Sequence, residues 1–151
     1  MKKVFFPGSF NPFTKGHEDI LLRLLELADS VVIGIGFNID KPAMKDEAEK
    51  NAEEIRRMLG RKGLEARVEV EIYEGLTAET AKALGADCMA RGVRNSCDFE
   101  YENSLATLNR KLFGIETLLL PCDPELSFIS STAVRDLLRH GRRDLAEKLL
   151  P

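Results

Sequence analysis

The chain has 151 residues, of which 44% are hydrophobic and 31% charged, and its formal net charge is −3. This balance predicts one globular domain over residues 1–151 and excludes a disordered chain. The slightly acidic charge disfavours a general nucleic-acid binder, and no apolar run approaches the roughly 20 residues that span a bilayer. The start, Met1-Lys2-Lys3, leads into an apolar run too short for a signal peptide. We therefore expect neither a nucleic acid nor a membrane as partner.

Strand and helix patterns alternate along the chain. Short apolar, β-branched runs predict five strands, at 3–6, 30–36, 66–73, 88–90 and 117–120. Helical patterns lie between them, at 15–28 with Thr14 as N-cap, at 46–62, at 77–84, at 98–113 with Asp98 as cap, and after Ser130-Ser131 with a break at Gly141. This order predicts an α/β fold, a single-domain Rossmann-like doubly wound parallel sheet of about five strands.

The most unusual sequences all follow predicted strands. They lie at 7–17, 37–45, 75–77, 91–102 and 121–132. Because ligands bind beyond the carboxyl ends of the strands in such sheets, we expect these five loops to face one cleft.

The first loop, PGSFNPFTKGH, lacks both common glycine-rich phosphate fingerprints. It nevertheless places His17 in the first turn of a helix, where free N–H groups and the helix dipole favour an anion. A histidine there can donate a hydrogen bond to a phosphate oxygen that gains charge in a transition state. Alone, the pattern is more often that of a turn followed by an ordinary helix.

Two further segments suit an anion. Arg91 and Arg94 follow the fourth predicted strand, and guanidinium forks match phosphate oxygens, although loop arginines are also common surface charges. The segment SFISST brings hydroxyl groups to the start of another helix, where one serine could simply be an N-cap. Three helices that follow strands of the same predicted sheet thus begin with groups that suit an anion, and this favours a polyphosphate ligand.

The cysteine pattern indicates a reducing compartment. Cys88, Cys97 and Cys122 form no C-x-x-C pair, and the sequence has just two histidines, His17 and His140. An odd number of cysteines without a secretion signal is typical of reduced thiols, and a Cys/His zinc site would need long-range convergence. We expect a cytoplasmic protein without structural zinc.

Three segments, PGSFNPFTKGH, RGVRNSCDFEYE and SFISSTAVR, resemble in order and spacing the bacterial phosphopantetheine adenylyltransferases. The T-x-G-H motif, here Thr14 to His17, marks only the wider nucleotidyltransferase superfamily, whereas its combination with R-G-x-R, D-F-E-Y-E and S-F-I-S-S is specific. The resemblance covers essentially the whole chain. It implies transfer of AMP from ATP to the 4′-phosphate of phosphopantetheine, giving dephospho-coenzyme A and pyrophosphate, without a covalent enzyme intermediate.

The resemblance also implies roles for individual residues. His17 would stabilise the α-phosphate in the transition state, and Ser9 would contact the attacking phosphate. Lys41 and Arg91 would hold the phosphate of phosphopantetheine, and Thr77 would contact its pantetheine arm. ATP would be bound by Ser9, Phe10, His17, Gly92, Val93, Arg94, Glu102, Leu126, Ser127, Phe128, Ile129, Ser130, Ser131 and Thr132. Mg²⁺ would be held mainly by phosphates and water rather than by protein ligands.

Several alternatives stay open at this point. The loop NIDKPAM is one residue shorter than the common form, so Lys45 is an alternative to Lys41. Another nucleotidyltransferase of the superfamily, such as one acting on nicotinamide mononucleotide, is the second candidate, and a nucleotide-binding regulator without catalysis is the third. The resemblance further implies a homohexamer and inhibition by coenzyme A. The stripe Leu105, Leu108 and Leu112 is either core or oligomer surface.

Overall fold

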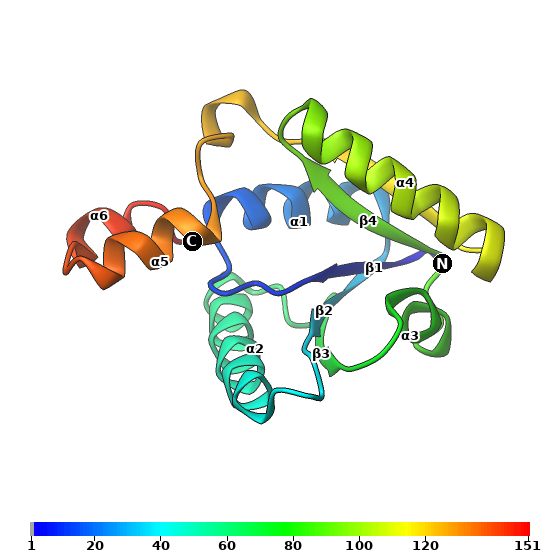
Figure 1. The fold of residues 1–151 in the computed structure, drawn as a ribbon, viewed down its shortest axis with the longest axis horizontal. Coiled ribbons are helices and arrows are strands. Elements are labelled where there is room, and N and C mark those ends of the chain that lie inside the picture. Colours follow the sequence, from blue (N-terminus) through cyan, green and yellow to red (C-terminus); the bar gives the residue numbers. More distant parts are fainter. Residues whose placement is uncertain (1) are drawn as a thin grey trace.

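The computed structural model describes residues 2–151, so that Met1, the first residue of the expected domain, lies outside them. Five strands form one sheet in the order β3-β2-β1-β4-β5, and each neighbouring pair is parallel. The strands are β1 (Lys3–Gly8), β2 (Ser30–Gly36), β3 (Val68–Tyr73), β4 (Cys88–Val93) and β5 (Glu116–Pro121). The expected Rossmann-like α/β sheet is therefore confirmed (Figure 1).

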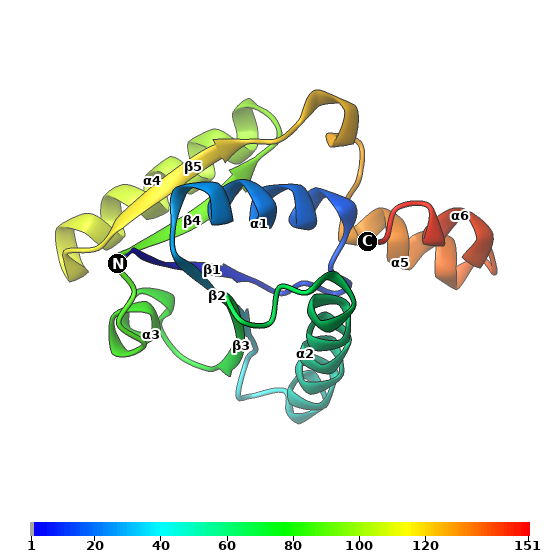
Figure 2. The ribbon, with the colours of Figure 1, turned by 180° about the vertical axis from the view of Figure 1, so that it is seen from behind.

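Helices cover both faces of the sheet. They are α1 (Lys15–Leu27), α2 (Pro42–Lys62), α3 (Thr77–Ala83), α4 (Ser96–Phe113), α5 (Ser131–Arg139) and α6 (Arg143–Glu147), with a 3-10 turn, η1, at Pro124–Leu126. The last two helices, α5 and α6, project from one side of this layered body in both views (Figures 1 and 2). Within residues 2–151, no helix is long and apolar enough to cross a membrane.

The period of two along each strand divides the core between the two faces. On β1, Val4 and Phe6 pack with α1 and α2, whereas Phe5 packs on the opposite face with α3 and with Phe113 at the end of α4. Because both faces are covered, β1 and β2 are buried almost throughout, which explains their continuous apolar sequences.

The centre of the sheet is a topological switch point. β1 and β4 are neighbours, but the helix after β1 packs on one face and the helix after β4 packs on the other. The two connections diverge, so the loops at the carboxyl ends of these strands leave a crevice between them. This geometry brings 7–17 and 91–102 together.

Helix starts differ partly from the sequence-based predictions. Thr14 is the N-cap of α1, as predicted, and the chain breaks at Gly141, which has φ 74°. α2 begins at Pro42, four residues before the predicted 46, because proline is well suited to a first helical position. The prediction of Asp98 as a cap is wrong, since Asn95 caps α4 and accepts a hydrogen bond from the Asp98 backbone N–H.

The leucine stripe of α4 is surface rather than core. Leu105, Leu108 and Leu112 are 36%, 49% and 67% exposed, respectively. The sequence left open whether these leucines belong to the core or to an oligomer surface, and their exposure shows that they are not part of the core of the isolated chain.

Candidate active site

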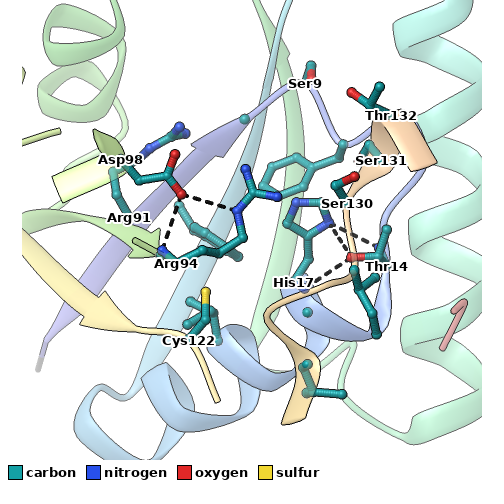
Figure 3. A pocket seen from close by; sticks show the side chains of 18 of the residues that line it. Ser9, Thr14, His17, Arg91, Arg94, Asp98, Cys122, Ser130, Ser131 and Thr132 are labelled. Carbon is teal, nitrogen blue, oxygen red and sulfur yellow. Dashed lines mark hydrogen bonds and ion pairs between the residues drawn. The ribbon is translucent and has the colours of Figure 1, made fainter. Parts of the chain in front are cut away.

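A cavity of about 290 Å³ opens at the carboxyl ends of β1 and β4. Its walls come from the β1–α1 loop, the first turn of α1, the end of β4, the start of α4, and the segment that leads into α5 (Figure 3). The predicted site residues that line it are Ser9, Phe10, His17, Arg91, Gly92, Arg94, Glu102, Leu126, Ile129, Ser130, Ser131 and Thr132. The fold therefore brings together three of the five loops that the sequence placed at one cleft.

His17 is oriented by the cap of its own helix. The backbone N–H of Thr14 donates to Nδ1 of His17 over 3.0 Å, and the Thr14 hydroxyl receives the His17 backbone N–H over 3.4 Å. Because Nδ1 acts as an acceptor, the neutral ring carries its proton on Nε2. This second nitrogen lies on the side of the ring that faces Arg94 (Figure 3).

The surroundings keep the His17 imidazole neutral. Burial, and to a smaller extent the positive charges of Arg91 and Arg94, together lower its pKa from 6.5 to about 4. The rings of Phe10 and Phe13 lie with centroids 4.9 and 5.3 Å from the imidazole and cover part of it. At neutral pH the cavity therefore contains an uncharged N–H donor beside a guanidinium group, an arrangement that suits an anion placed between them.

A strained turn shapes the wall next to His17. Phe10 has φ 46°, which non-glycine residues rarely adopt, and its buried ring lies directly over Gly8. A Cβ atom at Gly8 would come within 2.9 Å of that ring. Glycine at position 8 thus allows the Phe10 ring to fold inward, while Ser9, between these two residues, stays exposed at the rim of the cavity.

Both arginines of the cavity are held by carboxylates of α4. Arg91 donates from Nε and Nη2 to Oε1 of Glu102, at 3.0 and 2.8 Å, and from Nη1 to the carbonyl of Pro7. Arg94 donates from Nε to Oδ2 of Asp98 over 3.1 Å. Glu102 is 7% exposed, so the paired Arg91 provides the compensating charge that a buried carboxylate requires.

The segment before α5 adds polar groups on the opposite wall. The Ser130 side chain caps α5 by accepting the Ala133 N–H, and the Ser131 hydroxyl donates to the carbonyl of Pro12. Ser131 thereby ties α5 to the β1–α1 loop. The free N–H groups of the first turn of α5 remain on the side of the cavity, where they favour negative charge.

A second cavity, of about 370 Å³, adjoins the first. The two share Pro7, Gly8, Arg91 and Glu102, so the Arg91–Glu102 pair stands at their boundary. The second is predominantly apolar, and its large side chains are Tyr73, Leu76, Met89, Tyr101, Leu105, Leu108 and Phe113. Thr77 lies in this cavity rather than the first, with its hydroxyl 3.0 Å from that of Tyr73. The buried hydroxyl of Thr117 also lines it and has no hydrogen-bond partner.

Besides Thr77, four predicted site residues do not line the first cavity. Val93 ends β4 and uses its carbonyl to accept the Cys122 N–H. The Ser127 hydroxyl donates to the carbonyl of Pro124, and the Phe128 side chain is 70% exposed. Lys41 is exposed at the N-cap of α2 and lines neither cavity, and its alternative Lys45 is exposed on α2.

Among the residues with polar or thiol side chains that line the first cavity, sequence reasoning did not assign three to the site, namely Thr14, Asp98 and Cys122. The Thr-x-x-His spacing resembles a capping box and could have revealed the contact between Thr14 and His17. The four-residue spacing of Arg94 and Asp98 is likewise typical of an ion pair. No comparable signal exists for Cys122, which lies beside Gly92 in the cavity wall. Among the described residues, no cluster of three or more His, Cys, Asp or Glu side chains is arranged to hold a metal ion.

Comparison with solved structures supports the fold. The chain superposes on a bifunctional NMN adenylyltransferase/ADP ribose pyrophosphatase from Francisella tularensis with a TM-score of 0.67 and 19% identity, over 93% of this chain and 42% of that one. It superposes on a putative nicotinate-nucleotide adenylyltransferase from Vibrio parahaemolyticus with a TM-score of 0.62 and 18% identity, over 94% of this chain and 90% of that one. At this level of identity the similarity concerns the fold alone.

Sequence comparison gives the family. Residues 5–137 match the cytidylyltransferase-like family model. The chain is 46% identical over 142 residues to the phosphopantetheine adenylyltransferase of Phocaeicola vulgatus, which covers 94% of this chain and 91% of the relative. It is also 46% identical over 144 residues to that of Porphyromonas gingivalis, with 94% and 92% covered. The chain therefore belongs to the cytidylyltransferase-like family and, within it, to the phosphopantetheine adenylyltransferases.

Proposed function

We propose that this chain transfers the adenylyl group of ATP to the 4′-phosphate of phosphopantetheine, giving dephospho-coenzyme A and pyrophosphate. The observation that carries the proposal is the pair of adjoining cavities, one lined by anion-binding groups and the other by apolar side chains, with Arg91 at their boundary. ATP matches the first, and an acceptor with one phosphate and a long, weakly polar arm matches both.

The chemistry requires positioning more than bond-making by the protein. An oxygen of the acceptor phosphate attacks the α-phosphorus of ATP, a new P–O–P linkage forms, and pyrophosphate leaves with the bonding electrons. Because the attacking group is already an anion, no general base is needed. The protein contributes by aligning the two substrates and by stabilising the charge that develops on the α-phosphate oxygens.

His17 and Arg94 provide that stabilisation in the proposal. The Nε2–H of the neutral imidazole donates to an α-phosphate oxygen, and its geometry is fixed in advance by the contact of Nδ1 with Thr14. A preorganised donor costs little reorganisation when charge builds, which is why we assign the catalytic role to His17. Arg94 and the N–H groups of α5 neutralise the remaining phosphates. The segment from Leu126 to Thr132 would bind the nucleotide through its backbone and hydroxyl groups.

Arg91 would hold the acceptor phosphate. Its guanidinium has N–H groups to spare beyond those bound to Glu102 and Pro7, and it faces both cavities. The pantetheine arm would then extend into the apolar cavity past Thr77, where amide groups could use the hydroxyl of Thr117. Ser9 at the rim would contact the attacking phosphate. Lys41 stays a prediction as a second phosphate ligand, and it would need loop 37–41 to approach the cleft.

Mg²⁺ enters the proposal as part of the substrate, MgATP. The two carboxylates in the cavity, Asp98 and Glu102, are already bound to arginines. The donor set therefore fits a cation carried by phosphate oxygens and water better than one held by protein ligands. We also propose a cytoplasmic homohexamer inhibited by coenzyme A, which carries both a pantetheine arm and an adenosine group.

The test is pyrophosphate release by the purified protein with MgATP and either phosphopantetheine or nicotinamide mononucleotide. Release with phosphopantetheine alone is the expected result. Release with the mononucleotide alone would retain the phosphate chemistry and overturn the acceptor. Binding of ATP without release with either acceptor would favour a regulator.

A further inference from the structure

We infer that Asp98, to which the proposed function assigns no role, is a positioning residue that holds Arg94 for the phosphates of the nucleotide. The inference rests on the proposed function because it takes the first cavity as the ATP site. It concerns a residue of α4 that sequence reasoning expected to be only a helix cap.

One carboxylate oxygen of Asp98 binds Arg94 twice. Oδ2 accepts the Arg94 backbone N–H over 3.2 Å and the side-chain Nε–H over 3.1 Å. The two bonds fix both the backbone at the start of the β4–α4 connection and the direction in which the Arg94 side chain leaves it. Arg94 is 41% exposed, so without this contact its long side chain would have little to hold it in one rotamer.

The contact leaves the useful edge of the guanidinium free. A guanidinium group offers one edge formed by Nε and a terminal nitrogen, and a second edge formed by the two terminal nitrogens. Asp98 occupies Nε, and the terminal nitrogens of Arg94 extend toward His17 (Figure 3). That second edge presents two parallel N–H groups and can bind phosphate oxygens in a bidentate manner. Asp98 thus aims Arg94 without competing for its phosphate-binding side.

The same helix holds the other arginine in a parallel way. Glu102 lies one turn after Asp98 and binds Arg91, so two carboxylates on one face of α4 hold two arginines that follow or end β4. The pairs differ in position, because Arg91 and Glu102 line both cavities whereas Arg94 and Asp98 line only the first. Loss of Asp98 should therefore affect ATP and spare the acceptor.

A purely structural role for Asp98 is the competing explanation. Asp98 occupies the third position of α4, where a negative charge near the helix N-terminus is favourable. From there its carboxylate can accept the backbone N–H of Arg94, the residue before the N-cap. If this were its only role, Asp98→Ala would lower the melting temperature and leave the affinity for ATP unchanged. The two explanations therefore predict different measurements.

The experiment compares Asp98→Ala, Asp98→Asn, Arg94→Ala and the double variant Arg94→Ala/Asp98→Ala in the full chain. Glu100→Ala is the matched control, because Glu100 is an exposed carboxylate of the same helix turn. KM for ATP, KM for phosphopantetheine, kcat and the melting temperature are measured for each. Isothermal titration with ATP gives the affinity independently of turnover.

We expect Asp98→Ala to raise KM and Kd for ATP about three- to tenfold, the range of a half-exposed charged contact, with KM for phosphopantetheine within about twofold. Asp98→Asn, which keeps an acceptor for both N–H groups, should recover part of the loss, and Glu100→Ala should behave as wild type. In the Arg94→Ala background, removal of Asp98 should have no further effect on ATP.

Unchanged ATP affinity in Asp98→Ala, or an equal loss with and without Arg94, would overturn the inference. If Asp98→Ala does not fold, the same comparison is made with Asp98→Asn, for which a smaller shift is expected. Failure of the proposed function would be seen separately, as a wild-type protein that releases no pyrophosphate with phosphopantetheine.

Discussion

The two nitrogens of His17 have separate tasks, and two substitutions can separate them. Asparagine places its amide near the position of Nδ1, so His17→Asn can still accept the Thr14 N–H but has no donor at the position of Nε2. Glutamine reaches the position of Nε2, so His17→Gln keeps a donor toward the cavity and loses the acceptor for Thr14. The structure therefore predicts opposite effects on catalysis and on stability.

The magnitudes follow from the contacts. With a pKa of about 4, His17 is neutral in all but roughly one molecule in a thousand at pH 7, so the asparagine variant loses a neutral N–H donor and no charge. Loss of one donor to a transition-state oxyanion costs about 2.7–4 kcal/mol, or about 10²–10³ in kcat. Loss of a helix-cap acceptor in His17→Gln costs about 0.5–2 kcal/mol, a decrease of a few degrees in melting temperature.

The assay combines steady-state pyrophosphate release with thermal unfolding of both variants. We expect His17→Asn to keep KM for ATP within about threefold and its melting temperature near that of wild type, with the full loss in kcat. His17→Gln should melt earlier and retain more of kcat. A His17→Asn variant with wild-type kcat would refute the assignment of Nε2 as the catalytic donor.

Three further predictions concern stability and acceptor binding. Because burial lowers the His17 pKa, the native state binds fewer protons than the unfolded state between pH 6.5 and 4, so the free energy of unfolding should fall by up to about 3 kcal/mol as the pH decreases through this window. Urea unfolding of His17→Asn should show a smaller fall over the same pH range, and an equal fall would exclude His17 as the cause. Gly8→Ala should cost about 1–3 kcal/mol in urea unfolding, since its Cβ would lie 2.9 Å from the Phe10 ring; a wild-type midpoint would mean that the ring moves without cost. Arg91→Ala should raise KM for phosphopantetheine at least about tenfold, and it should destabilise the fold because it leaves Glu102 buried and unpaired. Lys41→Ala should raise KM for phosphopantetheine less. A larger effect of Lys41→Ala than of Arg91→Ala on this KM would make Lys41 the principal phosphate ligand.

Local patterns predicted the architecture and much of the first cavity. The apolar runs of β1 and β2 are continuous because both faces of the sheet are covered, so their assignment as strands needed no tertiary information. The parallel sheet then placed His17, Arg94 and Ser130 in one cavity, since each follows the carboxyl end of a strand. Sequence order and topology were sufficient for this part of the site.

Side-chain pairing was less accessible from the sequence. Asp98 and Asn95 are both good N-cap residues, and only the path of the chain after β4 decides that Asn95 caps α4 while Asp98 binds Arg94. The Arg91–Glu102 pair depends on the packing of α4 against β4, which no local spacing determines. The second cavity combines side chains from β3, α3, β4, α4 and β5, so its apolar lining appears only once the fold is complete.

The most direct test of the central claim is the stereochemistry at the α-phosphorus. The wild-type protein would be given a single diastereomer of α-thio ATP with phosphopantetheine and Mg²⁺, and the configuration of the dephospho-coenzyme A thio-analogue would be determined. Direct attack by an acceptor phosphate held beside His17 predicts inversion, the outcome of one in-line displacement. Retention would reveal two displacements through a covalent adenylyl-enzyme, and it would contradict the account of this site as one that acts by positioning and charge stabilisation.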